Sequence, residues 1–337
     1  MKLISMIFYI LEAKNLYIMC CPLRSSIDPC VCETESNNQI SISCVGEDVN
    51  DENIDLIMVS INEFLLSSHQ TLLQSFRLQK TSLTFLNEEV FGTIPFINIE
   101  IYENQILNIA NITEHIFFAA IYTLKSFYAS NNDLYDSDGS DFISIFKNFV
   151  FLEYLSITEN GIQRISRKTF NNLEQNNLKS IDLSSNMISS VEEYAFYDLI
   201  NLIYLNLSNN SLVTLNPFSL TLNHWSSAPL QLMLNSNRLN ANQLSEQLFS
   251  QTKRPLILFM QNNKMHFFPE EIFRPIIENE KNYFIDVKDN PFLCDCERHK
   301  WLFLLTKHLR IKIQNMFCSQ QSIWKFEDIV YKNCFDK

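Results

Sequence analysis

The stretch LKSIDLSSNMISSV at residues 178–191 decides the fold. Its apolar residues stand at the first, fourth, sixth, eleventh and fourteenth places, and Asn186 stands at the ninth. A surface helix would repeat its apolar residues about every 3.6 positions, and a half-buried strand would alternate them throughout. This stretch alternates only briefly before the asparagine, so it predicts a short strand that ends in a bend.

The same unit recurs along most of the chain, and its ninth positions are about 23 to 28 residues apart. These positions are Thr81, Asn104, Asn132, Asn160, Asn186, Asn210, Asn237, Asn263 and Asn290. Both the spacing and the order of apolar residues are typical of leucine-rich repeats. The sequence therefore predicts an α/β solenoid, namely a leucine-rich repeat horseshoe of about nine turns with a parallel β-sheet on its concave face.

The side chains of each predicted turn explain why its strand and its bend form. Apolar residues at alternate strand positions face the interior, and the asparagine side chain can bond backbone groups that the bend leaves without partners. On the return side of the repeats, we expect a column of phenylalanines to form a core spine. Its members are Phe91, Phe117, Phe170, Phe196, Phe218 and Phe273.

Nine cysteines lie in two groups near the ends of the chain. They are Cys20, Cys21, Cys30, Cys32 and Cys44 at the front, and Cys294, Cys296, Cys318 and Cys334 at the back. Both groups contain a C-x-C spacing, whereas zinc sites commonly use paired C-x-x-C spacings. Clustered cysteines in a secreted chain form disulfides, and a solenoid needs a terminal unit to cover its core. We therefore predict a disulfide cap at each end.

The first residues of the chain predict secretion. Lys2 precedes an apolar segment at 3–11, which is too short to span a bilayer, and a second apolar segment precedes Cys20. The alternative is a start codon assigned upstream of the mature chain. We predict a signal peptide at 1–20, an N-terminal cap with its adjoining repeat at 21–72, the leucine-rich repeats at 73–290 and a C-terminal cap at 291–337. The product is expected to be extracellular, without a membrane span.

The charge and the motifs exclude several classes of protein. A net charge of -12 is unlike a nucleic-acid binder, which usually shows a basic face. No G-x-S-x-G, glycine-rich phosphate loop or H-E-x-x-H motif occurs, so we predict neither an enzyme nor a cofactor. The segment DSDGSD at residues 136–141 resembles the start of a calcium loop. It lacks the later glutamate of such loops, so we interpret it as a solvated acidic insertion and predict no metal site.

Three N-glycosylation acceptors fit a secreted chain, and their asparagines are Asn111, Asn206 and Asn209. Asn206 and Asn209 fall at outward positions of one strand, where glycans would obstruct the concave face. Asn111 falls on the return side, and it is the acceptor that we expect to be occupied.

Function is expected on the concave face, because stacked strands make one broad and rigid surface. The outward positions that we predict to bind a partner are Arg77, Tyr102, Tyr128, Tyr154, Tyr204, Met233 and Phe259. Aromatic residues in register are typical of protein-binding surfaces. The alternative is a set of scattered apolar surface residues, which are common and need no explanation.

The two end segments resemble the caps of extracellular leucine-rich repeat proteins. Residues 290–302, NPFLCDCERHKWL, are similar to the C-terminal cap, in which Trp301 and Leu302 would cover the last repeat. Residues 21–32, CPLRSSIDPCVC, resemble arthropod secreted chains related to the non-catalytic subunit of shrimp (Oplophorus) luciferin monooxygenase. The family pattern implies four disulfides, which are Cys21–Cys32, Cys30–Cys44, Cys294–Cys318 and Cys296–Cys334.

Three functional hypotheses follow from these features. The first is a secreted module that binds an extracellular protein partner through its concave face. The second, which the resemblance implies, is a non-catalytic subunit that stabilises a separate secreted enzyme. The third is a soluble pattern-recognition protein that binds glycan or lipid.

Overall fold

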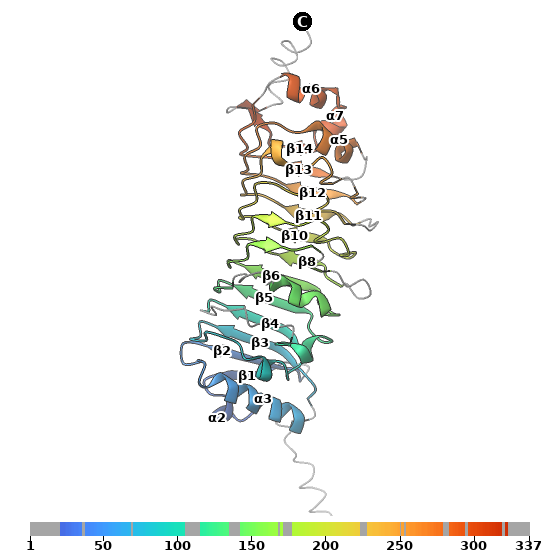
Figure 1. Ribbon diagram of the computed structural model, residues 1–337. Helices are drawn as coiled ribbons and strands as arrows, with labels where there is room; N and C mark the ends of the chain where they lie inside the picture. Colours follow the sequence, from blue (N-terminus) through green and yellow to red (C-terminus); the bar gives the residue numbers. More distant parts are fainter. Residues whose placement is uncertain are drawn as a thin grey trace, which may run out of the picture.

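One long β-sheet runs through the part of the chain that the computed structural model describes (Figure 1). That part comprises residues 21–35, 38–68, 70–104, 115–134, 142–167, 169–170, 177–222, 228–249, 251–252, 254–278, 283–293, 296–318 and 321–322. The strand order is β1-β2-β3-β4-β5-β6-β8-β10-β11-β12-β13-β14. From β2 onward every neighbouring pair in this sheet is parallel. The predicted parallel sheet of a solenoid is therefore confirmed.

The strands of the stack are short and follow the repeat. They are β2 (Ile40–Val45), β3 (Leu73–Gln79), β4 (Phe96–Tyr102), β5 (Ser126–Ser130), β6 (Tyr154–Thr158), β8 (Ser180–Asp182), β10 (Tyr204–Asn206), β11 (Leu230–Met233), β12 (Leu256–Phe259), β13 (Phe284–Asp286) and β14 (Ile313–Gln314). In β3 the apolar Leu73, Phe76 and Leu78 are buried, whereas Arg77 between them is exposed. This alternation leaves one face of the sheet in the core and the other face open to solvent.

An asparagine ladder closes the turns after the strands. The side chain of Asn263 accepts a hydrogen bond from the Leu239 amide at 3.0 Å and donates to the Leu234 and Met260 carbonyls at 2.9 and 3.1 Å. Asn237 repeats the arrangement one turn earlier, with Oδ1 3.0 Å from the Leu212 amide. Thr81, the one exception in the series, donates its hydroxyl to Asn104 at 2.7 Å. The ladder satisfies buried backbone groups that no strand reaches.

The residue before each ladder position has a left-handed backbone. Its φ lies between 52° and 57° at Lys80, Glu103, Asn131, Glu159, Ser185, Asn209, Ser236, Asn262 and Asp289. Residues other than glycine and asparagine rarely adopt this region, because the Cβ approaches the backbone. The same bend at every turn keeps the ladder asparagines directed into the core.

The return segments contain turns and helical elements of different lengths. The helical elements in and beside the stack are α3 (Ile54–Ser68), α4 (Glu88–Phe91), η2 (Phe118–Ala120), η3 (Phe142–Asn148), η4 (Ala241–Gln243) and α5 (Glu270–Glu278). The strands β7 (Arg164–Ile165) and β9 (Ser190–Val191) pair separately. Five of the six predicted spine phenylalanines are buried, and the rings of Phe170 and Phe196 stack at 5.8 Å.

Phe218 is the exception, and its predicted place in the spine is wrong. Its backbone is left-handed, with φ 56°, and its half-buried ring stacks on Tyr194 at 5.3 Å. In the same turn Leu215, Leu220 and Leu222 are buried, at 1%, 3% and 2% exposed. The return segments differ in local conformation, so equal spacing from the ladder does not give equal burial.

A small disulfide-bonded unit precedes the parallel stack at its N-terminal end. It contains α2 (Arg24–Ile27) and β1 (Val31–Thr34), which pairs antiparallel with β2. The bonds are Cys21–Cys32 and Cys30–Cys44, which are the two pairs that the family resemblance implied. Cys20 lies outside the described residues. The N-terminal disulfides therefore tie the first strand of the parallel stack to the segment in front of it.

The described C-terminal segment comprises α6 (Cys296–Leu304), α7 (Lys307–Arg310), β14 as the last strand of the long sheet, and the pair β15 (Phe317–Cys318) and β16 (Gln321–Ser322). Trp301 and Leu302 are buried, and the Trp301 ring stacks on Phe268 at 6.0 Å. The indole N–H donates to the Phe268 carbonyl at 3.2 Å. Cys294 and Cys334 lie outside the described residues, so the two C-terminal disulfides stay predictions.

Candidate binding surface on the open sheet face

The open face of the sheet presents three rows of side chains, because the strands pair in register. The first row is Ser75, Asn98, Ser126, Tyr154, Ser180, Tyr204, Gln231, Ile257 and Phe284. The second row is Arg77, Glu100, Tyr128, Ser156, Asp182, Asn206, Met233, Phe259 and Asp286. The third row begins Gln79, Tyr102, Ser130 and Thr158. We call these rows together the open sheet face.

All seven predicted binding residues lie on this face, but they do not form one array. Arg77, Tyr128, Met233 and Phe259 belong to the second row, Tyr154 and Tyr204 to the first, and Tyr102 to the third. The expectation of aromatic residues in register is therefore wrong. The aromatic side chains fall at three different outward places of the repeat, and only the pairing of the strands decides which of them become neighbours.

The N-terminal part of the face combines ion pairs with tyrosines. Arg77 contacts Glu100 on the next strand at 2.6 Å, and Lys80 lies 3.4 Å from Glu103. These groups are partly exposed to water, so each pair contributes at most about 1 kcal/mol to stability. Their effect is to fix cross-strand positions on a surface that stays polar.

Burial changes the acidity of three tyrosines on the face. It raises the pKa of Tyr102 from 10.0 to about 12, and the negative charge of Glu100 adds to the effect. Burial also raises the pKa of Tyr128 and of Tyr204, which lies near Asp182. These phenols therefore stay neutral hydrogen-bonding groups at physiological pH.

The Tyr102 pKa predicts a loss of stability in alkali. The unfolded chain ionises this phenol near pH 10.0, whereas the folded chain keeps it protonated until about pH 12, so stability falls as the pH rises through this interval. We expect Tyr102→Phe to reduce the fall. Urea midpoints of both proteins, measured below pH 10 and between pH 10 and 12, check this. Equal falls in the two proteins would contradict the assignment.

The C-terminal part of the face carries a group of adjoining apolar side chains. Met233, Ile257, Phe259 and Phe284 occupy adjoining places on three neighbouring strands, and we call them the apolar patch. All four are half-buried, and the rings of Phe259 and Phe284 are 5.8 Å apart. Sequence reasoning missed Ile257 and Phe284, although both stand at the third place of their repeats, as Tyr154 and Tyr204 do.

A polar segment separates the two parts of the face. Asn206 donates its side-chain amide to Asp182 at 3.0 Å and accepts from the Ser208 amide at 3.0 Å. Asn206 is only 8% exposed, so a glycan on this acceptor would have to break these bonds. Asn209 is exposed, and Asn111 lies outside the described residues.

Comparison with known proteins identifies the repeat. Residues 176–222 match the leucine rich repeat family. A solved chain from the octameric complex of latrophilin 3 (Lec, Olf), Unc5D (Ig, Ig2, TSP1) and FLRT2 (LRR) is similar, with a TM-score of 0.56 and 17% identity. The match covers 90% of this chain and 95% of that chain. The chain folds as a leucine-rich repeat protein. A search of curated proteins finds no match to it.

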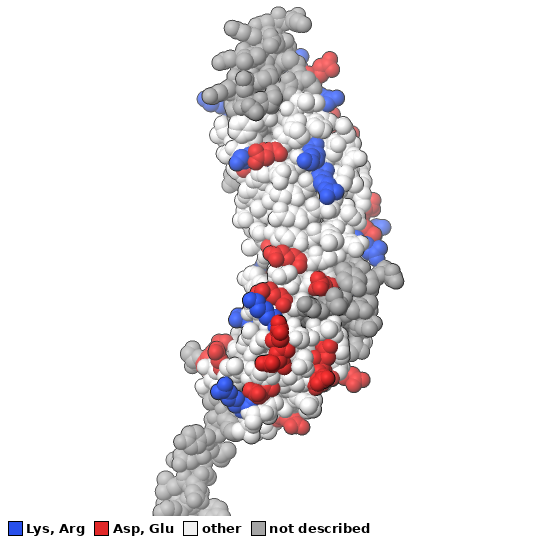
Figure 2. Space-filling view, turned by 90° about the vertical axis from the view of Figure 1, so that its left-hand side faces the viewer, with Lys and Arg blue, Asp and Glu red and all other residues white. Residues whose placement is uncertain are grey.

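Charge is unevenly distributed along the stack of repeats. Figure 2 shows one side of the stack, on which acidic side chains gather over the N-terminal half and the C-terminal half carries few charges. On the open sheet face, the ion pair of Arg77 and Glu100 joins β3 to β4, whereas the apolar patch lies on β11 to β13. The two halves of the leucine-rich repeat array therefore offer different chemistry to a partner.

The described residues contain neither a candidate metal site nor a helix that could cross a membrane. No group of three or more His, Cys, Asp or Glu side chains among them could hold a metal ion. Among the helices described here, none has the length and apolar character needed to cross a bilayer. The calcium-like segment at 136–141 lies outside the described residues.

Proposed function

We propose that this protein is a secreted interaction module that binds a partner protein through its open sheet face, the concave face of the predicted horseshoe. The apolar patch is the observation that carries the proposal. The proposed activity is binding, and no reaction is assigned to the chain.

The apolar patch has the composition of a binding hot spot. Two phenylalanines, a methionine and an isoleucine adjoin on a rigid sheet, and each stays partly open to water. Protein interfaces are enriched in aromatic residues and methionine at their centre, and a few such residues carry most of the binding energy. A partner that covers the patch would gain this apolar burial without ordering any flexible loop of this chain.

The tyrosines of the N-terminal part, together with Tyr204 on β10, supply the polar side of the same interface. Tyr154 is 42% exposed, and Tyr102, Tyr128 and Tyr204 are half-buried. Tyrosine offers a rigid ring and a hydroxyl at a low cost in side-chain entropy. The partner is therefore expected to be a folded protein that presents an apolar group opposite β11 to β13 and polar groups opposite β4 to β6.

Secretion is supported by the cysteines. The two N-terminal disulfides join four of the front cysteines, and such bonds persist in oxidising compartments. The apolar segment at 3–11 and the exposed acceptor Asn209 agree with that compartment. The solved complex that contains a similar chain is named as an assembly of several proteins, which agrees with a role in protein binding.

A capture experiment with matched variants tests the proposal. The bait is the secreted full chain, and the first variant carries Met233→Asp with Phe259→Asp. Placing carboxylates in a patch that the partner would bury is expected to weaken partner binding about 30-fold or more, as measured by biolayer interferometry on the captured protein.

The control variant makes the same exchanges outside the sheet, Met187→Asp with Phe151→Asp. Met187 is 61% exposed and Phe151 is 48% exposed, and neither lies in a strand. We expect this variant to bind as the unchanged chain does. If both variants lose binding equally, or neither does, the open sheet face is not the binding surface.

A further inference from the structure

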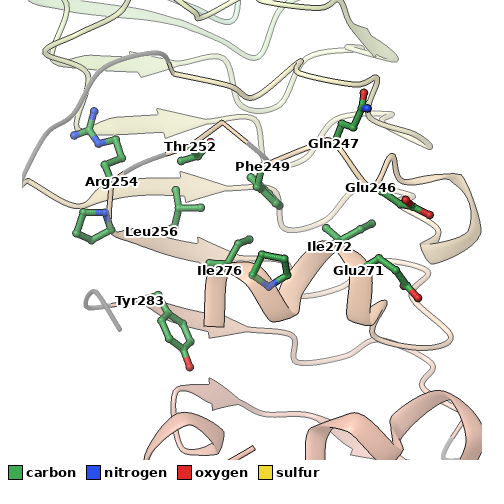
Figure 3. A pocket seen from close by; sticks show the side chains of 12 residues that line it. Glu246, Gln247, Phe249, Thr252, Arg254, Leu256, Glu271, Ile272, Ile276 and Tyr283 are labelled. Atoms are coloured by element: carbon green, nitrogen blue, oxygen red, sulfur yellow. The ribbon is translucent and has the colours of Figure 1, made fainter. Parts of the chain in front are cut away.

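A cavity of ≈ 400 Å³ lies between the return segments of the seventh and eighth repeats (Figure 3). Its walls come from the segment before β12, the start of β12, helix α5 and Tyr283 in front of β13. This volume lies in the range of small-molecule sites, which are about 300–1,000 Å³. The residues of the apolar patch do not line it, so the cavity is separate from the proposed protein-binding site.

The middle of the cavity is apolar. Phe249, Leu256 and Ile272 are buried, and Ile276 is half-buried beside them. Figure 3 shows these four side chains between the two ends of the site. Such a slot would accept an aliphatic or aromatic body of a ligand.

The two ends of the cavity differ in charge. Glu246 and Glu271 lie together at one end, and Arg254 and Tyr283 lie at the other (Figure 3). Both glutamates are exposed, and within the described residues neither forms an ion pair. Glu270 and Glu278, on the same helix as Glu271, instead pair with Arg274. The acidic end therefore has two carboxylates that are available to a cation.

Arg254 lies at the opposite end of the cavity from these carboxylates and is held in place there. Its Nε and Nη2 both donate to the Ala228 carbonyl, at 3.2 and 2.9 Å, and the residue is 4% exposed. The Tyr283 hydroxyl is likewise used, because it donates to the Leu309 carbonyl at 3.0 Å. Arg254 keeps its positive charge, so the far end would repel a cation, and an ammonium group is expected at the glutamate end.

We propose that this cavity binds a small amphipathic amine, with its apolar body between Ile272, Ile276 and Leu256 and its ammonium group at Glu246 and Glu271. The apolar walls provide most of the affinity through burial. The two carboxylates provide the choice of head group through charge complementarity.

Three probes with the same tail and different heads test the proposal, namely decylammonium, decanol and decanoate below their micelle-forming concentrations. Titration calorimetry on the full chain at low salt is expected to give the tightest binding for decylammonium, about fivefold tighter than decanol, and the weakest for decanoate. Added salt should reduce the preference for the ammonium head, because exposed charges are screened.

Two variants and one control separate the contribution of charge from that of apolar burial. Glu246→Gln with Glu271→Gln should remove the preference for decylammonium and leave decanol binding unchanged. Glu270→Gln is the matched control, since Glu270 precedes Glu271 on α5 but pairs with Arg274, and it should keep the preference. Ile276→Trp should fill the slot and abolish binding of all three probes, with an unchanged far-ultraviolet circular dichroism spectrum showing that the chain still folds.

Three results would overturn the proposal. The first is that none of the probes binds to the unchanged chain. The second is that the three probes bind equally, or that decanoate binds best. The third is that binding survives Ile276→Trp in a folded protein, which would place the probes elsewhere on the surface.

Discussion

Asn263→Leu is expected to lower the free energy of unfolding by about 3–5 kcal/mol. Asn263 is 1% exposed, and leucine has nearly its size but none of its hydrogen-bonding groups. The change leaves the Leu239 amide and the Leu234 and Met260 carbonyls without this partner in the core. Each buried group that loses its partner costs about 1–3 kcal/mol. Urea unfolding followed by circular dichroism measures the loss.

The neighbouring asparagine provides the control. Asn262 is exposed and has a left-handed backbone with φ 53°, and its side chain makes a long bond of 3.3 Å to Ser236. Asn262→Gly should leave stability unchanged or slightly higher, because glycine adopts this backbone without strain. Similar losses for the two variants would mean that the ladder hydrogen bonds are not the cause.

Hydrogen exchange should locate the effect of Asn263→Leu. Each repeat packs only on its neighbours, so the loss is expected to be largest in β11, β12 and β13. Amides in β3 and β4, which lie several turns away, should keep their protection. A uniform loss along the stack would indicate that the array unfolds as one unit.

Replacing Cys30 and Cys44 together by alanine is expected to lower the free energy of unfolding by about 3–5 kcal/mol. The bond closes a loop with a sequence separation of 14, and its loss gives more freedom to the unfolded chain. Both cysteines are also buried, at 1% and 0% exposed, so the variant loses packing at the end of the core. Thermal unfolding under non-reducing conditions measures the change.

The second N-terminal disulfide is the matched comparison. Cys21 and Cys32 are half-buried and enclose a sequence separation of 11, so replacing both by alanine removes less packing. We expect a smaller loss, about 2–3 kcal/mol. If the Cys21–Cys32 pair proved the costlier one to remove, the buried bond would not be the main support of the cap.

The sequence predicted the scaffold because its decisive features are local. The repeat places Asn186, Asn210 and Asn237 at the same bend of successive turns, and the hydrogen bonds of the ladder follow from this spacing. The alternation around each strand indicated which residues are buried, as in β3. Phe218 was misplaced because the return segments vary in conformation, which spacing alone does not reveal.

The candidate sites depend on segments that are far apart in the chain. The apolar patch exists because Met233 pairs with Phe259 and Ile257 pairs with Phe284, at separations of a whole repeat. The cavity exists because α5 packs beside the start of β12 and leaves space between them.

By itself, the sequence determined the repeat, the ladder and the parallel stack. Its resemblance to a known family also implied how the front cysteines pair. Only the tertiary structure decided which outward side chains adjoin, where the open sheet face is apolar and where a cavity remains. The physical reason is that a short-range pattern fixes the conformation of one turn. The contacts between turns depend on strand register and on the packing of return segments, which differ from one repeat to the next.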